Sequence, residues 1–365
     1  SKLAVDAIKS YVEFLKSLKN DSPRSFRLGN DLYKKKFEFD IQSGYTADEV
    51  LAKAIAHKTE LHRKMAEISV KLWPKYFAGQ EMPKDSLQMI RQMIDKLSLI
   101  HVQPDSFQSA IEKQIPVLVD FIKEKNLIYI DPSKPLVVRK EPDYMAGVAG
   151  ASISAPGPYD KTGNTYYNVG SLSGWDKDRA ESYLREYNQY ILQILNIHEA
   201  IPGHYTQLVY ANQSPSLIKS LLGASSMIEG WAVYTERMML EEGYGNNEPE
   251  MWLMYYKWNL RSTCNFILDN SVHTKNMSKE EALNLLMNEA FQQKTEAENK
   301  WRRVSLTQVQ LCCYFTGYTE IYDFREEMKK KQGDQFKLKD WHEKFLSYGS
   351  APVKYIRQLM LEEKK

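Results

Sequence analysis

Two histidines and a glutamate within residues 196–207, NIHEAIPGHYTQ, are the residues whose types and spacing suggest metal chemistry. In the H-E-x-x-H motif of zinc proteases, one helix places two histidines four residues apart on one face, and the glutamate beside the first is the general base. Here the order is His198, Glu199 and His204, so the histidines are six residues apart. On a straight helix this spacing leaves the two side chains roughly 120° apart, too far round to share a metal.

The residues between the two histidines, Ala200-Ile201-Pro202-Gly203, are able to interrupt that helix. Proline removes a backbone N–H and clashes with the preceding turn, and glycine adopts dihedral angles that other residues avoid. We expect a break here that returns His204 to the face of His198. From the residues alone, a variant metal motif and a chance occurrence both stay open.

A third metal ligand is expected in the downstream segment IEGWAVYTE, residues 228–236. Catalytic zinc takes three protein ligands and keeps one position open. Glu229 and Glu236 are seven residues apart, so they share one helix face about two turns apart. Glu229 is the candidate third ligand, and Glu236 is placed to orient a ligand histidine by a hydrogen bond. The alternative is that both glutamates lie on the surface of an amphipathic helix.

The elements that must position these residues are predicted to be mainly helical. Apolar residues recur at helical spacing over 4–18, 84–97 and 106–125, and Thr46-Ala-Asp-Glu49 and Ser278-Lys-Glu-Glu281 read as capping boxes. Between about 127 and 172 there are instead short β-type runs at 127–130, 135–140 and 147–154. A turn at 161–164 and a strand at 165–169, which contains Tyr167, complete a predicted hairpin.

We therefore predict a helical region over 1–126 and a catalytic region over 127–365, forming one continuous unit with a small sheet beside the metal helices. An exposed edge of that sheet could bind an extended peptide by main-chain hydrogen bonds, or the hairpin could be purely structural. The chain has 365 residues and a net charge of +2, which gives no indication of a nucleic-acid partner. No apolar run is long enough for a transmembrane helix.

Four motifs together resemble the bacterial family DUF885: HEAIPGH, IEGWAVYTE, ILDNSVH and QLCCYFTGYTEI. The family looks like a branch of the largely helical zinc metallopeptidases, similar in layout to the thimet-oligopeptidase-like and carboxypeptidase-Taq-like enzymes. The resemblance implies one zinc ion per chain held by His198, His204 and Glu229, with Glu199 as the base. Family members are often longer at the N-terminus and many look exported or lipid-anchored, so we expect a periplasmic or lipid-anchored full-length protein.

The resemblance also marks residues near the C-terminus. Asp269 and His273 match the family's D-x-x-x-H, and Arg303, Gln310 and Tyr314 match its last motif.

This sequence departs from the family pattern at several positions. Asn265 stands where the family has an arginine, Gln308-Val309 replace its usual Pro-Gly, Phe315 replaces a lysine, and Tyr205 replaces a second histidine. Most of these departures fall in the region expected to recognise substrate, so they bear on specificity more than on metal binding.

Roles for these residues follow as expectations. A tetrahedral intermediate needs a hydrogen-bond donor for its oxyanion, and Tyr314 or His273 is the candidate. By similarity to related helical peptidases Tyr314 is preferred, while His273 could instead bind a substrate carboxylate or cap its helix. Arg303 or Arg261 could bind a C-terminal carboxylate through two parallel hydrogen bonds. Each of these side chains could alternatively be structural.

The predicted function is a zinc-dependent metallopeptidase that acts on short peptides, as a carboxypeptidase, an oligopeptidase or a dipeptidase. Zinc hydrolysis of a non-peptide amide or ester would use the same chemistry. A non-catalytic peptide-binding protein on a peptidase fold is the alternative from another class, although such a protein has no need of Glu199. The oligomeric state is left open.

Overall fold

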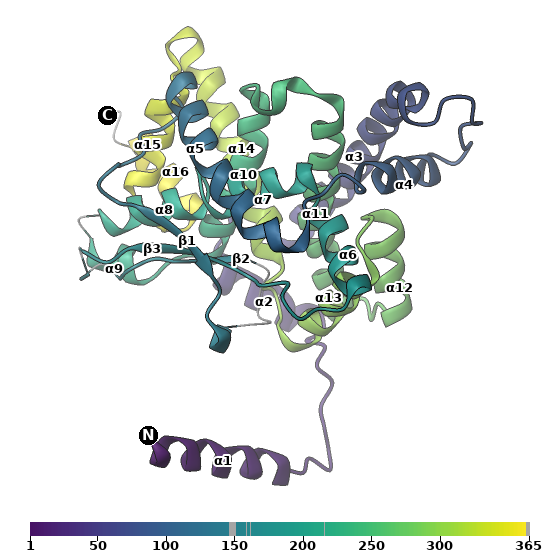
Figure 1. Cartoon of the computed structure of the whole chain (residues 1–365). Coiled ribbons are helices and arrows are strands. Elements are labelled where there is room, and N and C mark those ends of the chain that lie inside the picture. Colours follow the sequence, from purple (N-terminus) through teal and green to yellow (C-terminus); the bar gives the residue numbers. More distant parts are fainter. Residues whose placement is uncertain (146–150, 158, 161, 215, 363–365) are drawn as a thin grey trace.

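The computed structural model describes residues 1–362 except 146–150, 158, 161 and 215. It has a mainly α fold with one small sheet, as predicted (Figure 1). The helices are α1 (Lys2–Ser17), α2 (Asn30–Ile41), α3 (Ala47–Tyr76), α4 (Ser86–Leu97), α5 (Phe107–Lys125), α6 (Lys177–Glu186), α7 (Gln189–Glu199), α8 (His204–Asn212), α9 (Leu217–Leu221), α10 (Ser225–Glu241), α11 (Pro249–Thr274), α12 (Lys279–Asn284), α13 (Lys294–Leu306), α14 (Cys312–Gln332), α15 (Leu338–Ser347) and α16 (Val353–Glu362).

Local sequence signals fix several helix ends. Thr46 accepts a hydrogen bond from the backbone N–H of Glu49, whose carboxylate accepts one from the backbone N–H of Thr46. Ser278 and Glu281 do the same at the start of α12, so both predicted capping boxes are confirmed. α1 is helical but has no buried residue, and it stands apart from the other helices in Figure 1.

The central helix of the body is α11. Nearly all of its residues after Pro249 are buried, because α3, α7 and α14 pack around it. α14 in turn packs along α10. The buried apolar residues form one cluster that extends from α2 to α16, so the predicted regions 1–126 and 127–365 share a single core.

Two glycines allow α10 and α14 to pack unusually closely. A Cβ atom on Gly230 would lie 2.4 Å from the Cα atom of Gly317, and one on Gly317 would lie 1.7 Å from the carbonyl oxygen of Ser226. Neither position has room for a side chain. This close approach places Glu229, next to Gly230, near the start of α14, where Tyr314 lies one turn before Gly317.

The sheet has three strands, β1 (Leu136–Lys140), β2 (Ala151–Ser154) and β3 (Thr165–Val169), in the order β1-β3-β2. β2 and β3 pair antiparallel, and β1 pairs parallel to β3. The predicted strand at 127–130 is wrong, since these residues have no regular structure, although Leu127 and Ile128 are buried in the core. Residue 161 of the predicted turn lies outside the described residues.

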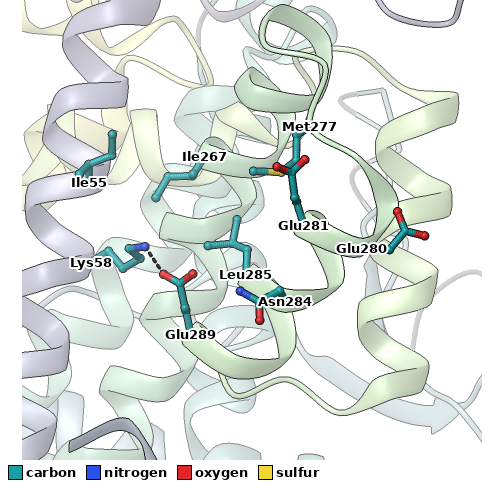
Figure 2. Close-up of a pocket in the computed structure, with 9 residues that line it drawn as sticks. All are labelled: Ile55, Lys58, Ile267, Met277, Glu280, Glu281, Asn284, Leu285 and Glu289. Carbon is teal, nitrogen blue, oxygen red and sulfur yellow. Dashed lines mark hydrogen bonds and ion pairs between the residues drawn. The ribbon is translucent and has the colours of Figure 1, made fainter.

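A surface cavity of about 590 Å³ lies between α3, α11 and α12 (Figure 2). Its wall includes the ion pair of Lys58 with Glu289 and the π-helical turn η4 (Leu285–Glu289). None of the candidate metal ligands lines it. Over the described part of the chain, no helix is both long enough and apolar enough to cross a membrane.

His342 is fully buried in a neutral form and should make the fold sensitive to acid. Its Nδ1–H donates to the carbonyl oxygen of Leu127 at 2.8 Å, and its Nε2 accepts from the hydroxyl of Tyr234 at 2.7 Å. Burial lowers the pKa of His342 to about 3. An unfolded chain binds this proton below pH about 6.5 and the folded chain does not, so stability falls as the pH decreases from about 6.5 towards 3.

We therefore expect the wild type to lose about 2 kcal/mol more unfolding free energy than His342→Gln between pH 7.5 and pH 5. Urea unfolding of both proteins at the two pH values measures this difference, in which titrations shared by the two proteins cancel. An equal pH dependence of the two proteins would show that His342 is not the group responsible.

Candidate metal centre

The helix is interrupted between the two histidines of the quoted motif. α7 ends at Glu199 and α8 begins at His204, and the Ile201–Pro202 peptide bond between them is cis. The backbone N–H of Gly203 donates to the carbonyl oxygen of Ile197 at 3.0 Å. A Cβ atom on Gly203 would lie 1.8 Å from the carbonyl oxygen of His198, so only glycine fits this return of the chain.

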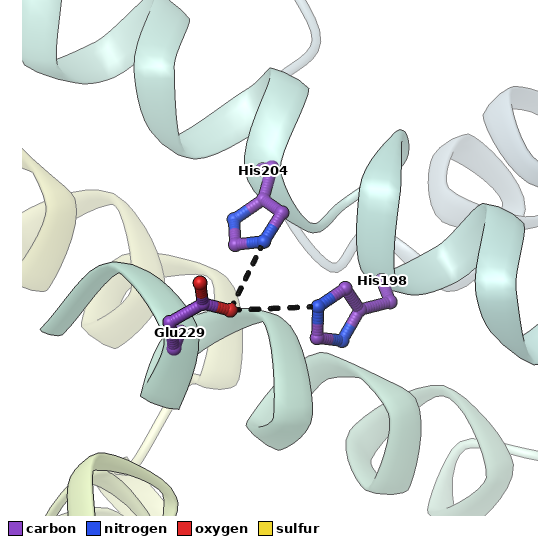
Figure 3. A group of neighbouring side chains, drawn as sticks. All are labelled: His198, His204 and Glu229. Atoms are coloured by element: carbon purple, nitrogen blue, oxygen red, sulfur yellow. Dashed lines mark ion pairs between the residues drawn. The ribbon is translucent and has the colours of Figure 1, made fainter. Parts of the chain in front are cut away.

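This break brings His198 and His204 to the same carboxylate (Figure 3). The Oε2 atom of Glu229, on α10, lies 3.7 Å from Nε2 of His198 and 3.4 Å from Nε2 of His204. One ligand atom from each residue lies within 4.8 Å of the others. Two imidazoles and one carboxylate that converge in this way suit a zinc ion with an open coordination position.

Glu236 holds the first histidine in place. Its Oε1 atom lies 2.7 Å from Nδ1 of His198 and accepts a hydrogen bond from Nε1 of Trp258 at 3.0 Å. Glu236 is fully buried. This carboxylate fixes the orientation of the ring so that Nε2 faces Glu229, which is the role expected of it from the sequence. Trp258, on α11, is a contributor that the sequence motifs did not indicate.

His198 and Glu229 shift each other's pKa in opposite directions. Burial alone would lower the pKa of His198, but its hydrogen bonds with Glu229 and Glu236 outweigh burial and raise it to about 10. Burial would raise the pKa of Glu229, but the two histidines hold it well below its usual range. A metal that binds to Nε2 of His198 must displace the proton that these interactions favour there.

Glu199 lies at the end of α7 beside His198. Burial raises its pKa, against the opposing effect of the two histidines. Its side chain is partly exposed, and it makes no hydrogen bond or ion pair with any described residue. A carboxylate with a raised pKa and no partner is suited to exchange protons with water or substrate.

Tyr314 approaches the same site from α14. Its hydroxyl oxygen accepts a hydrogen bond from Nη2 of Arg303 at 3.2 Å, and Arg303 also donates to Oε1 of Gln310 through Nε and Nη2. Burial, and next the charge of Glu229, raise the pKa of Tyr314 well above its usual value. The phenol therefore stays protonated at neutral pH and can donate a hydrogen bond. Tyr314, Arg303 and Gln310 form one group, as their shared motif suggested.

His273 lies in a different environment. Its Nε2–H donates to the carbonyl oxygens of Val304 and Thr307 at 3.0 and 3.3 Å, and its ring stacks on Tyr33 at 6.0 Å between centroids. None of its hydrogen bonds or ring contacts within the described part of the chain reaches a candidate metal ligand. These contacts join the end of α11 to the end of α13, and they leave Tyr314 as the candidate oxyanion donor.

Asp269 holds the segment before α14. Its Oδ1 atom accepts a hydrogen bond at 3.0 Å from the backbone N–H of Val309. Val309 has a φ of 69°, in the left-handed region that β-branched residues avoid. The hydrogen bond to Asp269 therefore stabilises the strained backbone conformation of Val309, the residue directly before Gln310. Tyr205, on α8, donates to the carbonyl oxygen of Lys134.

Tyr167 and Arg261 contact residues that neighbour the candidate ligands. Tyr167 is fully buried on β3 and donates to Oδ1 of Asn196, on α7, at 2.9 Å. This hydrogen bond connects the sheet to α7, the helix that carries His198. Arg261, on α11, lies 2.5 Å from Oε1 of Glu296 and over the ring of Trp258. Next to Arg261 lies Lys300, whose pKa responds to the charge of Glu229 and which the motifs did not include. Its signal in the sequence was its position, one helical turn before Arg303.

Known proteins match this chain in sequence and in structure. A solved structure from Shewanella oneidensis, described as "a putative lipoprotein of unknown function", has 62% sequence identity and a TM-score of 0.90, with 99% of this chain and 65% of that chain covered. A crystal structure described as a "putative lipoprotein" from Colwellia psychrerythraea has 18% identity and a TM-score of 0.77, with 91% and 55% covered, and shows likeness of fold alone. This chain thus spans less than two thirds of the length of either protein.

No curated protein matches the chain. The profile described as "Bacterial protein of unknown function (DUF885)" matches residues 1–360, which is nearly the whole sequence. The resemblance expected from the four motifs is thereby confirmed at the level of the family. The chain belongs to the bacterial DUF885 family, whose function is unknown.

Proposed function

We propose that this protein is a zinc-dependent metallopeptidase that hydrolyses short peptides. The convergence of His198, His204 and Glu229 beside the unpartnered carboxylate of Glu199 carries the proposal. The donor set is the one that zinc prefers, and it leaves room in the coordination sphere for a reactant. When bound, zinc supplies a Lewis acid that activates water and polarises a carbonyl group.

Each side chain then has a defined task. Glu199 takes a proton from the attacking water and delivers it to the leaving amine nitrogen, for which its raised pKa is favourable. Tyr314 donates a hydrogen bond to the oxyanion of the tetrahedral intermediate, and Arg303 holds the hydroxyl in position. Glu236 keeps the ring of His198 in its binding orientation.

The sheet supports a peptide as the substrate. β2 pairs only with β3 among the described strands and also contacts α7, the helix that carries His198 and Glu199. Among the described residues, one edge of β2 therefore has no strand partner. Such an edge binds an extended peptide through main-chain hydrogen bonds. A non-peptide amide or ester would not use this edge, so a panel of the three substrate classes separates them.

The description of the Shewanella oneidensis relative as a putative lipoprotein supports a further part of the proposal. We propose that the full-length protein is exported and lipid-anchored, and that it meets its peptides outside the cytoplasm.

Metal content tests the proposed function most directly. Purified protein supplied with zinc and then freed of excess metal should contain about one zinc per chain by elemental analysis. His204→Ala should lose this zinc, because two ligands alone do not retain the ion. His101→Ala is the matched control, since His101 contacts Val102 and Glu181 rather than the site. Absence of zinc from the wild type would favour a metal-free peptide-binding protein instead.

A further inference from the structure

A group of buried and half-buried charged side chains from α6, α11 and α13 lies beside the candidate metal centre. Nζ of Lys257 lies 2.8 Å from Oε2 of Glu186, and both residues are at most 5% exposed. Nη2 of Arg261 lies 2.5 Å from Oε1 of Glu296. These two ion pairs use the two carboxylates of the group.

Lys300 is left without a close partner. It is 4% exposed, and the nearest carboxylate oxygen, Oε1 of Glu296, lies 4.0 Å from its Nζ atom, beyond hydrogen-bond distance. No described residue accepts a hydrogen bond from this ammonium group. Burial of a charge without an acceptor costs free energy of folding, so such a residue is rare in proteins unless it has a functional role. Burial and the neighbouring Arg261 and Arg303 lower the pKa of Lys300 to about 7, which agrees with this environment.

Two guanidinium groups beside Lys300 also have N–H groups without an acceptor among the described residues. Arg303 follows it by one turn of α13, and its Nε and Nη2 atoms bind Gln310 and Tyr314, while its Nη1 has no hydrogen-bond partner among the described residues. Nη1 of Arg261 is buried and has no hydrogen-bond partner in the part of the chain that the structure describes; Glu186 lies 4.0 Å away. The three side chains thus offer an ammonium and two N–H groups to a ligand.

The group contains more basic than acidic side chains. The basic members Lys257, Arg261, Lys300 and Arg303 outnumber the acidic members Glu186 and Glu296 by two. The charge of Glu229 also reaches Lys300 and Arg303, which places both near the metal centre, but a metal would take up that carboxylate. An anion from outside the chain would neutralise the excess.

We propose that Lys300, together with Arg303 and Arg261, forms a carboxylate-binding subsite beside the metal centre. The proposal rests on the proposed peptidase function and narrows its substrates to those with a free carboxylate close to the scissile bond. A peptide cut at its last residue meets this requirement through its C-terminal carboxylate. A guanidinium and an ammonium together match the geometry and charge of such a group.

The first test uses three blocked dipeptides. Benzoyl-glycyl-phenylalanine has a free C-terminal carboxylate, and its C-terminal amide has no carboxylate. The third, benzoyl-glycyl-aspartic α-amide, has its carboxylate on the side chain. The zinc-loaded wild type should cleave the free acid roughly 10- to 100-fold faster in kcat/KM than the amide, the range expected for a charge-assisted hydrogen bond. Lys300→Met should lose most of this preference, mainly through KM, and leave the amide unaffected. Cleavage of the third substrate at the rate of the free acid would assign the subsite to side-chain carboxylates.

Lys294→Met, on an exposed position of α13, is the matched control and should behave as the wild type. The zinc content of Lys300→Met should be unchanged, and its Tm should not fall, because methionine fills the same space without a buried charge. Equal cleavage of acid and amide by the wild type, or an equal loss on both substrates in Lys300→Met, would overturn the subsite while leaving the peptidase function intact.

If no substrate is cleaved, binding measurements distinguish the proposed carboxylate subsite from the proposed peptidase function. Calorimetry of the zinc-loaded protein with N-acetylphenylalanine and with N-acetylphenylalanine amide should detect the acid alone, and Lys300→Met should weaken that binding at least 10-fold. This result without hydrolysis would retain the subsite and remove the peptidase function. Failure of the wild type to prefer the acid would overturn the subsite.

Discussion

Glu199→Gln should lower peptide hydrolysis by about 10²- to 10⁴-fold, the usual contribution of a general base, while the protein keeps its zinc. The amide cannot accept the proton of the attacking water, but it has the same shape as the carboxylate. Glu199 is not one of the three converging ligands, so metal content should be unchanged. Because burial disfavours the charged carboxylate, the neutral amide should not lower the Tm. Kinetics on a peptide substrate, beside zinc analysis, measures both effects.

Glu298→Gln, on an exposed position of α13, is the matched control for this substitution and should keep full activity. If Glu199→Gln hydrolysed peptides at the wild-type rate, Glu199 would not be the base. If it lost zinc together with activity, the kinetic loss would reflect a damaged metal centre and would no longer identify a base.

Gly203→Ala should abolish stoichiometric zinc binding although it removes no ligand. The new Cβ atom would lie 1.8 Å from the carbonyl oxygen of His198 and 2.3 Å from that of Ile197. Both oxygens belong to the backbone at the end of α7, so the chain between α7 and α8 must move, and His204 moves with it. We expect at least a 100-fold loss of zinc affinity, together with a stability loss of about 4 kcal/mol, near the upper end for a single substitution.

Gly157→Ala is the matched control for Gly203→Ala, because nothing lies within 4 Å of a Cβ atom at Gly157. Zinc titration with a competing chelator and thermal unfolding of both variants measure the two effects. Wild-type zinc affinity in Gly203→Ala would mean that the tight return of the chain at Gly203 is not what places His204.

Both substitutions lie in a segment where the sequence itself was informative. Residue types and spacing within NIHEAIPGHYTQ predicted a helix break, and the structure has it between Glu199 and His204. The capping boxes at Thr46 and Ser278 were also predictable, because each depends on two side chains three residues apart. The helix break and the capping boxes each depend on residues only a few positions apart, so they can be recognised in a single sequence.

Other predictions failed or stayed open because they depend on distant neighbours. Residues 127–130 have the composition of a strand, but Leu127 and Ile128 are buried in the core without forming one, since strand preference depends on context. His273 matched a family motif, yet its ring is held by backbone carbonyls of Val304 and Thr307. Its sequence position could not show which groups would surround it.

The sequence by itself determined the family, the mainly helical fold, the candidate ligands His198, His204 and Glu229, and the break that lets the two histidines converge. Only the tertiary structure decided the close contact of α10 with α14 that brings Tyr314 towards Glu229, and the unbalanced charge around Lys300. The physical reason is that ligand type and helix breaking are properties of neighbouring residues. Burial, electrostatic balance and helix approach arise only when segments far apart in the chain pack together.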